Sequence, residues 1–467
     1  MRLLAIVVAT SVLAAQVGCA VRQYRPAPLS PAESAASLDA RSLADPALRE
    51  FYAKMAATPP AAWPPSDWNL ADLTVAAFYF NPAVRVAKAR VAEAEAAVVT
   101  AGTRPNPTLR GDLGGETAAE TPWLAGVGFS IPIETAGKRR DRVSRAEQLA
   151  EAARWDLAAT AWKVRSQVRR ALLDDLVATR SLELLATEEQ LRAERVRLLE
   201  QRLAVGLIAR PDVDAAAIEH TRTLLALRTA EGRARQAEIS LAAAIGLPAA
   251  ALHAVTVDWP AFDRPPRADT FAAGAIRGDA ALNRIDIRRG LAEYAASEAA
   301  LRLEIAKQYP DFDIGPTYAF EEGLHLFSIA LGLTLPVFNR HQGPIAEAEA
   351  RREQAAAQFL AVQAAGVAQA EQALARFTAA LAELAQADRL IQQAAAQDEA
   401  VRRALAAGEG DRVALNGVRL QKAAATTGRL DALTNAQQAL GDLEDAVQRP
   451  LLPGDIQPLS ARFPVLR

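Results

Sequence analysis

The 467-residue chain has little of what most enzymes, metal proteins and disulfide-rich scaffolds require. It contains one cysteine, Cys19, so no disulfide can form within the chain. The four histidines are scattered, and no cluster of ligand side chains has the spacing of a metal site. No nucleophile-elbow, phosphate-loop or HExxH pattern occurs. We therefore expect no enzymatic activity, no cofactor and no bound metal.

Charge and hydropathy exclude two further classes. The net charge is -2, so no basic excess indicates a nucleic-acid partner. Although 51% of the residues are hydrophobic, only 5% are aromatic, because alanine supplies much of the apolar count. Beyond the N-terminus there is no run of about 18 apolar residues that predicts a transmembrane helix. A chain of this kind can cross a membrane only by means of strands.

The N-terminus has the pattern of a secretory signal peptide over residues 1–18. Arg2 precedes an apolar run, Leu3 to Val17, and Gly18 precedes the lone Cys19. This resembles a bacterial lipoprotein cleavage box, although Gln16 replaces the usual aliphatic residue. We expect Cys19 to carry lipid, including palmitate, and residues 19–69, rich in proline and alanine, to form a lipid-anchored extended arm. A plain signal peptide with an incidental cysteine is the alternative.

Two stretches alternate strictly between large apolar and small residues. Trp123 to Ile133 reads WLAGVGFSIPI, and Leu324 to Val337 reads LHLFSIALGLTLPV. A period of two predicts β-strands, and the unlike faces are typical of a strand between lipid and a water-filled lumen. An ordinary half-buried strand of a soluble sheet is the alternative. Alternating stretches near 108–113 and 310–321 precede these two, and the charged residues predicted to face the lumen are Arg110, Asp112, Asp311 and Asp313.

Long helices are predicted for most of the remaining chain. Heptad spacing predicts helices over 137–205 and 344–407, each followed by a glycine-containing turn and a second helix, over 212–245 and 412–448. Further helices are expected over 70–101 and 275–307. Landmarks recur at a nearly constant offset, since Arg284 follows Asn81, and Pro310 follows Pro107, by 203 residues. The pattern predicts a two-fold internal repeat, over 70–259 and 260–450, with a C-terminal tail over 451–467.

Four strands are too few for a closed barrel, and lipid tolerates no open strand edge. The strands must therefore be shared between chains, and three copies would supply about twelve. Alanine-rich helix pairs would continue such a barrel as a hollow cylinder. A solid bundle or a filament-type coiled coil is the alternative for the helices alone.

Several segments resemble the TolC-like outer-membrane efflux proteins, over nearly all of residues 70–450. They are NPAVRVAKARVAEAEAAV from Asn81, RPNPTL from Arg104, SIPIETAGKR from Ser130, LAVGLIARPDV from Leu203 and LPVFNRHQGPIAEAEA from Leu335. The PNP, PxExxGKR and LPxFNRxQGxIAEA patterns are similar to the CzcC-like branch, which serves heavy-metal cation efflux.

The resemblance implies an α+β membrane protein. Its long helices would form a periplasmic α-barrel, and four strands per protomer would enter a trimeric, twelve-stranded transmembrane β-barrel in the bacterial outer membrane. It implies three kinds of partner: two further copies of the chain, a periplasmic adaptor protein, and an inner-membrane pump of the RND type.

The resemblance assigns function to the two helix-to-helix turns. The residues expected to dock the adaptor are Val205, Gly206, Leu207 and Ile208 of the first turn, with Gly408 of the second. The second turn departs from the family, whose acidic mouth residues align with Ala414 and Gly417 here. The residues predicted as a substitute periplasmic gate are Glu409, Asp411 and Arg412, for which a solvated polar loop is the alternative.

The predicted function is that of a passive exit duct in a tripartite efflux system, which the adaptor and pump open and which exports heavy-metal cations. A multidrug or type I secretion channel is one alternative. A periplasmic coiled-coil scaffold or adaptor without a pore is another, and such a protein would lack membrane-type strands.

Overall fold

The computed structural model describes residues 22–55, 62–115, 123–253, 255–259, 261–321 and 323–452. It divides into two units, Met1–Arg41 and Ser42–Arg467. The described part of the smaller unit contains α2 (Pro31–Asp39), which the Ser30 hydroxyl caps by accepting the Glu33 N–H at 3.3 Å. All other elements belong to the larger unit. The predicted signal peptide, Cys19 and the tail beyond residue 452 lie outside the described residues.

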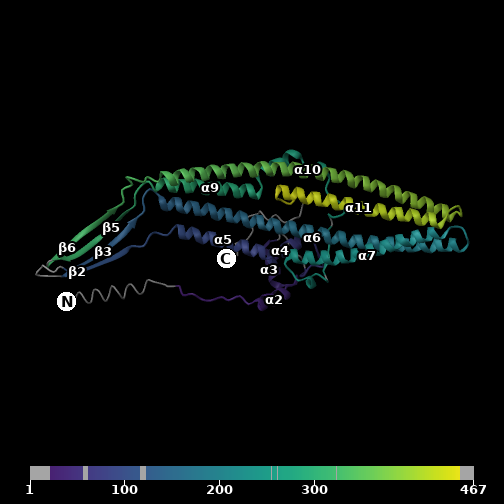
Figure 1. Cartoon of the computed structure of the whole chain (residues 1–467), viewed down its shortest axis with the longest axis horizontal. Coiled ribbons are helices and arrows are strands. Elements are labelled where there is room, and N and C mark those ends of the chain that lie inside the picture. The colour runs from purple at the N-terminus through teal and green to yellow at the C-terminus, as the bar shows by residue number, and fades with distance from the viewer. Residues whose placement is uncertain are drawn as a thin grey trace. The chain divides into compact units, whose positions relative to one another are not determined.

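Long helices form most of the larger unit (Figure 1). The two longest are α6 (Lys138–Ala204) and α10 (Gln342–Ala406), and each is followed by a 36-residue helix, α7 (Arg210–Ile245) or α11 (Arg412–Val447). The shorter α5 (Pro82–Ala101) and α9 (Ile285–Ala306) lie beside them. Neighbouring helices follow the order α10, then α9 and α11, then α6, then α5 and α7. The helices therefore form one layer, with α10 at one edge and α5 and α7 at the other.

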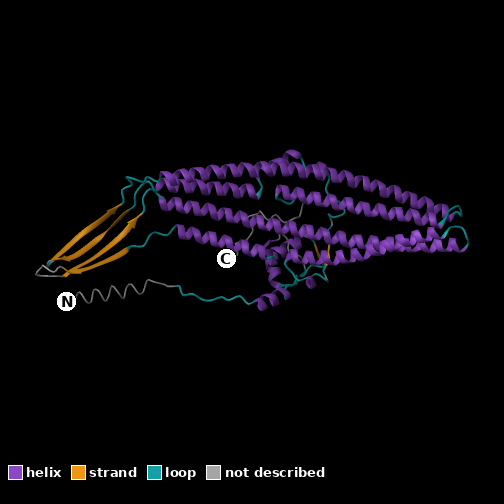
Figure 2. Ribbon diagram, viewed as in Figure 1, coloured by secondary structure: helices purple, strands orange, loops and turns teal. Residues whose placement is uncertain are grey.

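A four-stranded antiparallel sheet lies at one end of this layer (Figure 2). Its strands follow the order β2 (Thr108–Gly115), β3 (Trp123–Ile133), β5 (Phe312–Glu321) and β6 (Leu324–Leu333). Within the described residues, the edge strands β2 and β6 each pair on one side only. The turns that join α6 to α7 and α10 to α11 lie at the opposite end of the layer (Figure 2).

Two predicted helices are each divided into two. The helix predicted over 70–101 is broken at Asn81, between α4 (Leu70–Phe80) and α5. Because Asn81 precedes Pro82, it takes an extended conformation, and its side chain caps α5 by accepting the Ala83 N–H at 3.0 Å. The helix predicted over 275–307 is broken before Ile285, between α8 (Ala273–Leu282) and α9, where Arg284 takes an extended conformation without a following proline.

The arm predicted as extended over 19–69 also differs from the structure. Besides α2, it contains α3 (Pro46–Met55), which buries Leu48, Phe51 and Tyr52 in the main core. The 48, 51 and 52 spacing follows one helix face, a signal that the surrounding prolines obscured. A parallel pair of two-residue strands, β1 (Asp67–Trp68) and β4 (Thr256–Val257), was not predicted either.

The main hydrophobic core lies where α4, α6, α7, α10 and α11 meet, and it includes Phe78, Leu172, Ile245, Phe377 and Leu440. A buried ion pair crosses it. Arg165 of α6 donates two hydrogen bonds to Glu444 of α11, at 3.0 and 3.1 Å, and each side chain is 1% exposed. Polar and apolar contacts thus fix α6 against α11 near the C-terminal end of α11.

Candidate functional site

The register of the sheet sorts its side chains into two unlike faces. Ala125 lies opposite Phe320 and Val127 opposite Tyr318, and both pairs continue on β6 with large side chains, His325 and Phe327. On this face Phe327 is 81% exposed, and the neighbouring Ile329 is 76% exposed. The sequence prediction of one large apolar face is therefore confirmed.

The opposite face carries small and charged residues. Arg110 lies opposite Gly128, and Asp112 lies opposite Gly126. Asp313 shares this face and lies opposite Gly332 of β6. Because glycine has no side chain, nothing from these positions covers the charged groups. Arg110, Asp112 and Asp313 thus share one polar face, as their alternation predicted.

Asp311 has a different environment from the other predicted lumen-facing residues. It precedes β5 and accepts a hydrogen bond from the Lys138 ammonium at 2.7 Å and another from the Thr135 N–H at 2.7 Å. Lys138, the first residue of α6, also donates to the Tyr309 carbonyl at 2.6 Å. This cluster joins the base of β5 to the start of α6, so Asp311 is a structural residue of the junction.

The PxExxGKR segment, singled out as typical of cation exporters, also lies at this junction. Glu134 pairs with Arg142 at 2.6 Å, and Arg139 donates to the Gly102 carbonyl at the end of α5 at 2.6 Å. Together with Lys138, these residues hold the strand-to-helix connection in place. The motif therefore has a structural explanation that is independent of any cargo.

The two helix-to-helix turns share one backbone geometry. Gly206 and Gly408 have φ angles of 73° and 81°, in the left-handed region that glycine enters without strain. After Gly206, the Leu207 N–H donates back to the Arg202 carbonyl at 3.0 Å, and after Gly408 the Glu409 N–H donates to the Ala404 carbonyl at 3.0 Å. Both long helices therefore end in the same glycine C-cap motif.

The first turn presents part of the predicted docking set to solvent. Val205 is 70% exposed and Leu207 is 72% exposed. Ile208, in contrast, packs against a small cluster formed by Leu199, Val213 and Ala216. The structure therefore separates the set: Val205 and Leu207 form an exposed apolar surface, and Ile208 stabilises the turn.

The second turn does not present Asp411 as a free carboxylate. Asp411 caps α11 by accepting the Val413 N–H at 3.1 Å, and it forms an ion pair with Arg202 of α6. Burial alone would raise the pKa of Asp411, but the hydrogen bonds from Arg202 and the Val413 N–H outweigh it and lower that pKa. Glu409 and Arg412 are exposed. Of the three predicted gate residues, Asp411 thus links the two helix pairs.

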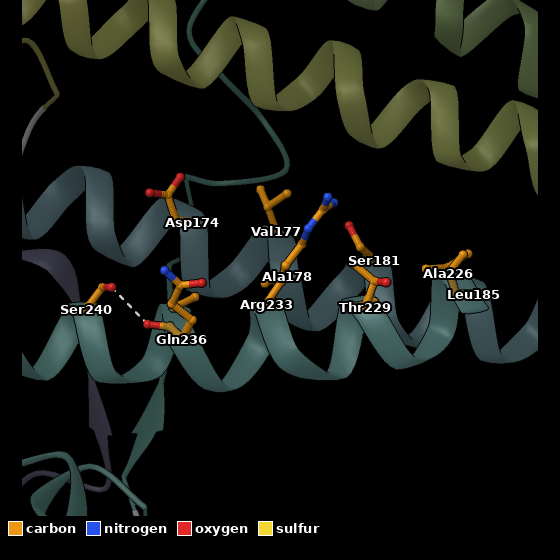
Figure 3. A pocket seen from close by; sticks show the side chains of 12 residues that line it. Asp174, Val177, Ala178, Ser181, Leu185, Ala226, Thr229, Arg233, Gln236 and Ser240 are labelled. Carbon is orange, nitrogen blue, oxygen red and sulfur yellow. Dashed lines mark hydrogen bonds between the residues drawn. The ribbon is translucent and has the colours of Figure 1, made fainter. Parts of the chain in front are cut away.

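A groove of about 590 Å³ between α6 and α7 is lined mainly by small and polar side chains (Figure 3). Asp174 and Arg233 are its charged members, and the Ser240 hydroxyl donates to the Gln236 carbonyl at 2.8 Å.

Within the described ranges, no three His, Cys, Asp or Glu side chains are placed to hold a metal ion. No helix in the described part of the chain combines the length and apolar character needed to span a membrane.

Other proteins also have a layer of long helices joined to a four-stranded antiparallel sheet. Residues 76–247 match the family described as outer membrane efflux protein. VceC from Vibrio cholerae superimposes with a TM-score of 0.65 at 19% identity, over 81% of this chain and 95% of VceC. CusC, whose structures are described as showing transmembrane channel formation, gives a TM-score of 0.64 at 17% identity, over 84% of this chain and 95% of CusC.

Among curated proteins, the chain is 25% identical over 269 residues to the cobalt-zinc-cadmium resistance protein CzcC of Cupriavidus metallidurans. The match spans 57% of this chain and 62% of CzcC. Together these findings show that the chain is similar in sequence to outer membrane efflux proteins and to CzcC, and that it has the fold of VceC and CusC.

Proposed function

We propose that three copies of this chain form a passive exit duct through the outer membrane. The sheet is the observation that carries the proposal: one face is apolar and exposed, the other is small and polar, and both edges are open within the described residues. Lipid cannot satisfy the free N–H and C=O groups of an edge strand. Pairing of β2 in one copy with β6 in the next would close a barrel of about twelve strands around the polar face.

The helix layer supports the same closure. Its α7 edge carries Ile218, Leu225 and Ile239, which are 55%, 66% and 56% exposed and follow heptad spacing. Its other edge, α10, carries Leu360 and Leu390, which are 61% and 52% exposed. Apolar stripes at opposite edges fit a ring in which α7 of one copy packs on α10 of the next. Such a ring would form the periplasmic α-barrel.

The internal repeat is part of this proposal. Asn81 of the first half donates to the Ala244 carbonyl at 3.0 Å, and Arg284 of the second half donates to the Ala446 carbonyl at 2.5 Å. In each half, the residue before a helix thus holds the C-terminal turn of the closing helix. Two related halves per chain would give the trimer six similar units around its axis.

The proposed adaptor would bind at the end of the helix layer where the two helix-to-helix turns lie. The exposed Val205 and Leu207 would dock a periplasmic adaptor, with Gly206 and Gly408 shaping the turns. An inner-membrane pump of the RND type would supply the energy, because the chain shows no motif for using any. Lipid on Cys19 would give the chain a second attachment to the membrane, in addition to the strands.

We propose heavy-metal cations as cargo. The relation to CzcC supports this choice, since that protein is described by its cobalt, zinc and cadmium resistance. Selectivity would lie in the pump and adaptor, because the described residues of this chain form no metal-ligand cluster. A multidrug or secretion channel would share the fold and differ in its partners.

Deletion and complementation in the native bacterium test the proposal. Loss of the gene should raise cellular cobalt, zinc or cadmium under metal stress, and the wild-type gene should restore export. Leu207→Asp should fail to restore it while still forming trimers, because a charge at the apolar turn opposes docking. Unchanged metal content with increased drug sensitivity would reassign the cargo. A chain that washes from membranes with carbonate would instead be a scaffold without a pore.

A further inference from the structure

Four short connections join the helix layer to the sheet (Figure 2). They span residues 102–107, 134–137, 307–311 and 334–341. Together with the first turn of α6, they contain six cationic and three anionic side chains. The cations are Arg104, Lys138, Arg139, Arg140, Lys307 and Arg340. The boundary between the helices and the sheet therefore carries an excess of positive charge.

The three carboxylates at this boundary are already paired within the chain. Asp311 pairs with Lys138 at 2.7 Å, Asp141 with Arg140 at 3.3 Å, and Glu134 with Arg142 at 2.6 Å. Arg104 and Arg340, in contrast, are exposed and have no ion-pair partner in the part of the chain that the structure describes. These two arginines lie on the outer connections, one beside each edge strand of the sheet.

Closure of the sheet would bring Arg104 and Arg340 to the same seam, the line along which β2 of one copy meets β6 of the next. Arg104 lies shortly before Thr108, the first residue of β2, and Arg340 lies shortly after Leu333, the last residue of β6. Neighbouring strands of the sheet are antiparallel, so pairing across the seam would be antiparallel too and would set the start of β2 beside the end of β6. Two guanidinium groups at one end of a seam repel each other unless an anion lies between them.

An apolar surface lies directly beside one of these arginines. Leu335 and Val337 continue the two-residue spacing of the apolar face beyond β6, and they are 64% and 62% exposed. Phe338 is 96% exposed, and Arg340 follows two residues later. The surface thus changes from apolar to cationic within a few residues, which is the order of chemistry in a phospholipid, from acyl chain to phosphate.

We propose that each seam binds an anionic phospholipid of the periplasmic leaflet, whose phosphodiester lies between Arg104 of one copy and Arg340 of the next. The inference rests on the proposed function, which supplies both the membrane and the seam. A guanidinium can donate two parallel hydrogen bonds to phosphate oxygens. The acyl chains would cover Leu335, Val337 and Phe338, which inorganic phosphate would leave exposed.

Lipid selectivity, measured by electron paramagnetic resonance, tests the site. The purified full-length protein would be reconstituted in phosphatidylcholine bilayers, and its association with spin-labelled phosphatidylglycerol would be compared with that of spin-labelled phosphatidylcholine. We expect the wild type to prefer phosphatidylglycerol by about threefold, and the double variant Arg104→Gln/Arg340→Gln to lose most of this preference. Arg104→Lys/Arg340→Lys should keep most of it, because both positive charges remain.

The matched control is Arg197→Gln/Arg402→Gln. It removes the same charge at the opposite end of the helix layer, from exposed residues that pair within their own helices, with Glu194 and Glu399. The control should keep the wild-type preference. The single variants Arg104→Gln and Arg340→Gln should give intermediate values, and they keep the test decisive if the double variant fails to insert into the bilayer.

The inference is overturned if the wild type associates equally with both lipids, or if the glutamine variants keep the preference of the control. Inorganic phosphate in place of chloride at equal ionic strength should leave the preference unchanged. If it abolishes the preference, the arginines bind the free anion and the lipid assignment is wrong. If no spin-labelled lipid is immobilised beside the wild type, the chain does not span the bilayer, and the proposed function falls together with this inference. If lipid is immobilised without preference, the duct stands and the seam site alone is wrong.

Discussion

Several polar side chains in this protein form ion pairs across helices. The Arg165–Glu444 pair is the clearest case, because both groups are removed from water and each depends on the other. Arg169 extends the network by donating to the Gln437 carbonyl at 2.8 Å, and Gln437 holds the Phe262 carbonyl at 2.7 Å. This network fixes the connector between the two halves onto the core.

Removing one partner of the buried pair should strongly destabilise the protein. Glu444→Ala leaves the Arg165 charge buried without its partner and should cost about 3–5 kcal/mol per protomer. Denaturant unfolding of the purified chain measures this loss. Asp442→Ala, at an exposed site two residues away, is the control and should change stability by less than about 0.5 kcal/mol. Equal stability of Glu444→Ala and wild type would show that the pair contributes nothing net.

Asp175 gives a pH-dependent prediction at the same scale. Burial first, and the charge of Glu238 second, raise its pKa from 3.8 to about 6. The folded state thus binds this proton more tightly than the unfolded state, so stability falls as the pH rises from about 4 through 6. Asp175→Asn should therefore stabilise the protein at pH 7.5 by about 1 kcal/mol, allowing for solvent screening at this half-buried site, and should give no gain below pH 4.

Melting curves at several pH values measure this difference. Glu183→Gln, at an exposed position on the same helix, serves as the control and should show no such pH-dependent gain. A stabilisation of Asp175→Asn that is the same at pH 4 and pH 7.5 would contradict the assignment.

The sequence predicted these residue-scale features unevenly. Alternation placed Arg110, Asp112 and Asp313 on one face correctly, because strand register follows directly from a period of two. Asp311 obeys the same alternation, yet the strand begins one residue later and Lys138 captures the carboxylate. The buried pair was not predicted, since its members lie 279 residues apart and only the tertiary fold brings them together.

At the scale of elements, the long helices and strands were predictable and their interruptions were not. Heptad spacing and strict alternation extend over many residues, so one residue that departs from the pattern does not change the predicted helix or strand. The break at Asn81 depends on one proline, and the break at Arg284 depends on contacts with α10 and α11.

The Arg202–Asp411 contact links the two helix pairs at the turns. Arg202→Ala removes this ion pair, which is worth up to about 1 kcal/mol at an exposed site. Asp411→Ala also removes the cap of α11, a further loss of about 1 kcal/mol. We expect the turns to separate more often in both variants, with the larger effect in Asp411→Ala and a change in the open fraction of about fivefold or more.

Spin labels at Leu207→Cys and Glu409→Cys, in a background without Cys19, report the distance between the turns. The control is Arg402→Ala, because Arg402 pairs only within α10, with Glu399. If both variants give the same distance distribution as the wild type, Asp411 is not a gate residue.

At the scale of the whole molecule, one chain leaves three surfaces unsatisfied. In the part of the chain that the structure describes, the sheet has two open edges, its apolar face is exposed, and apolar stripes lie at both edges of the helix layer. Each of these surfaces needs lipid or another copy of the chain. The proposed trimeric duct would satisfy all of them, because pairing between copies would leave no strand edge open to lipid.

Electron cryomicroscopy of the purified protein in lipid nanodiscs directly shows how many chains form a particle and whether the sheet closes into a barrel. The account predicts three chains around one axis, about twelve strands closed through β2–β6 pairing, and a continuous passage from the sheet to the helix turns. A particle with a single chain, or one in which the edges of the sheet stay open and no passage runs through the helices, would contradict it.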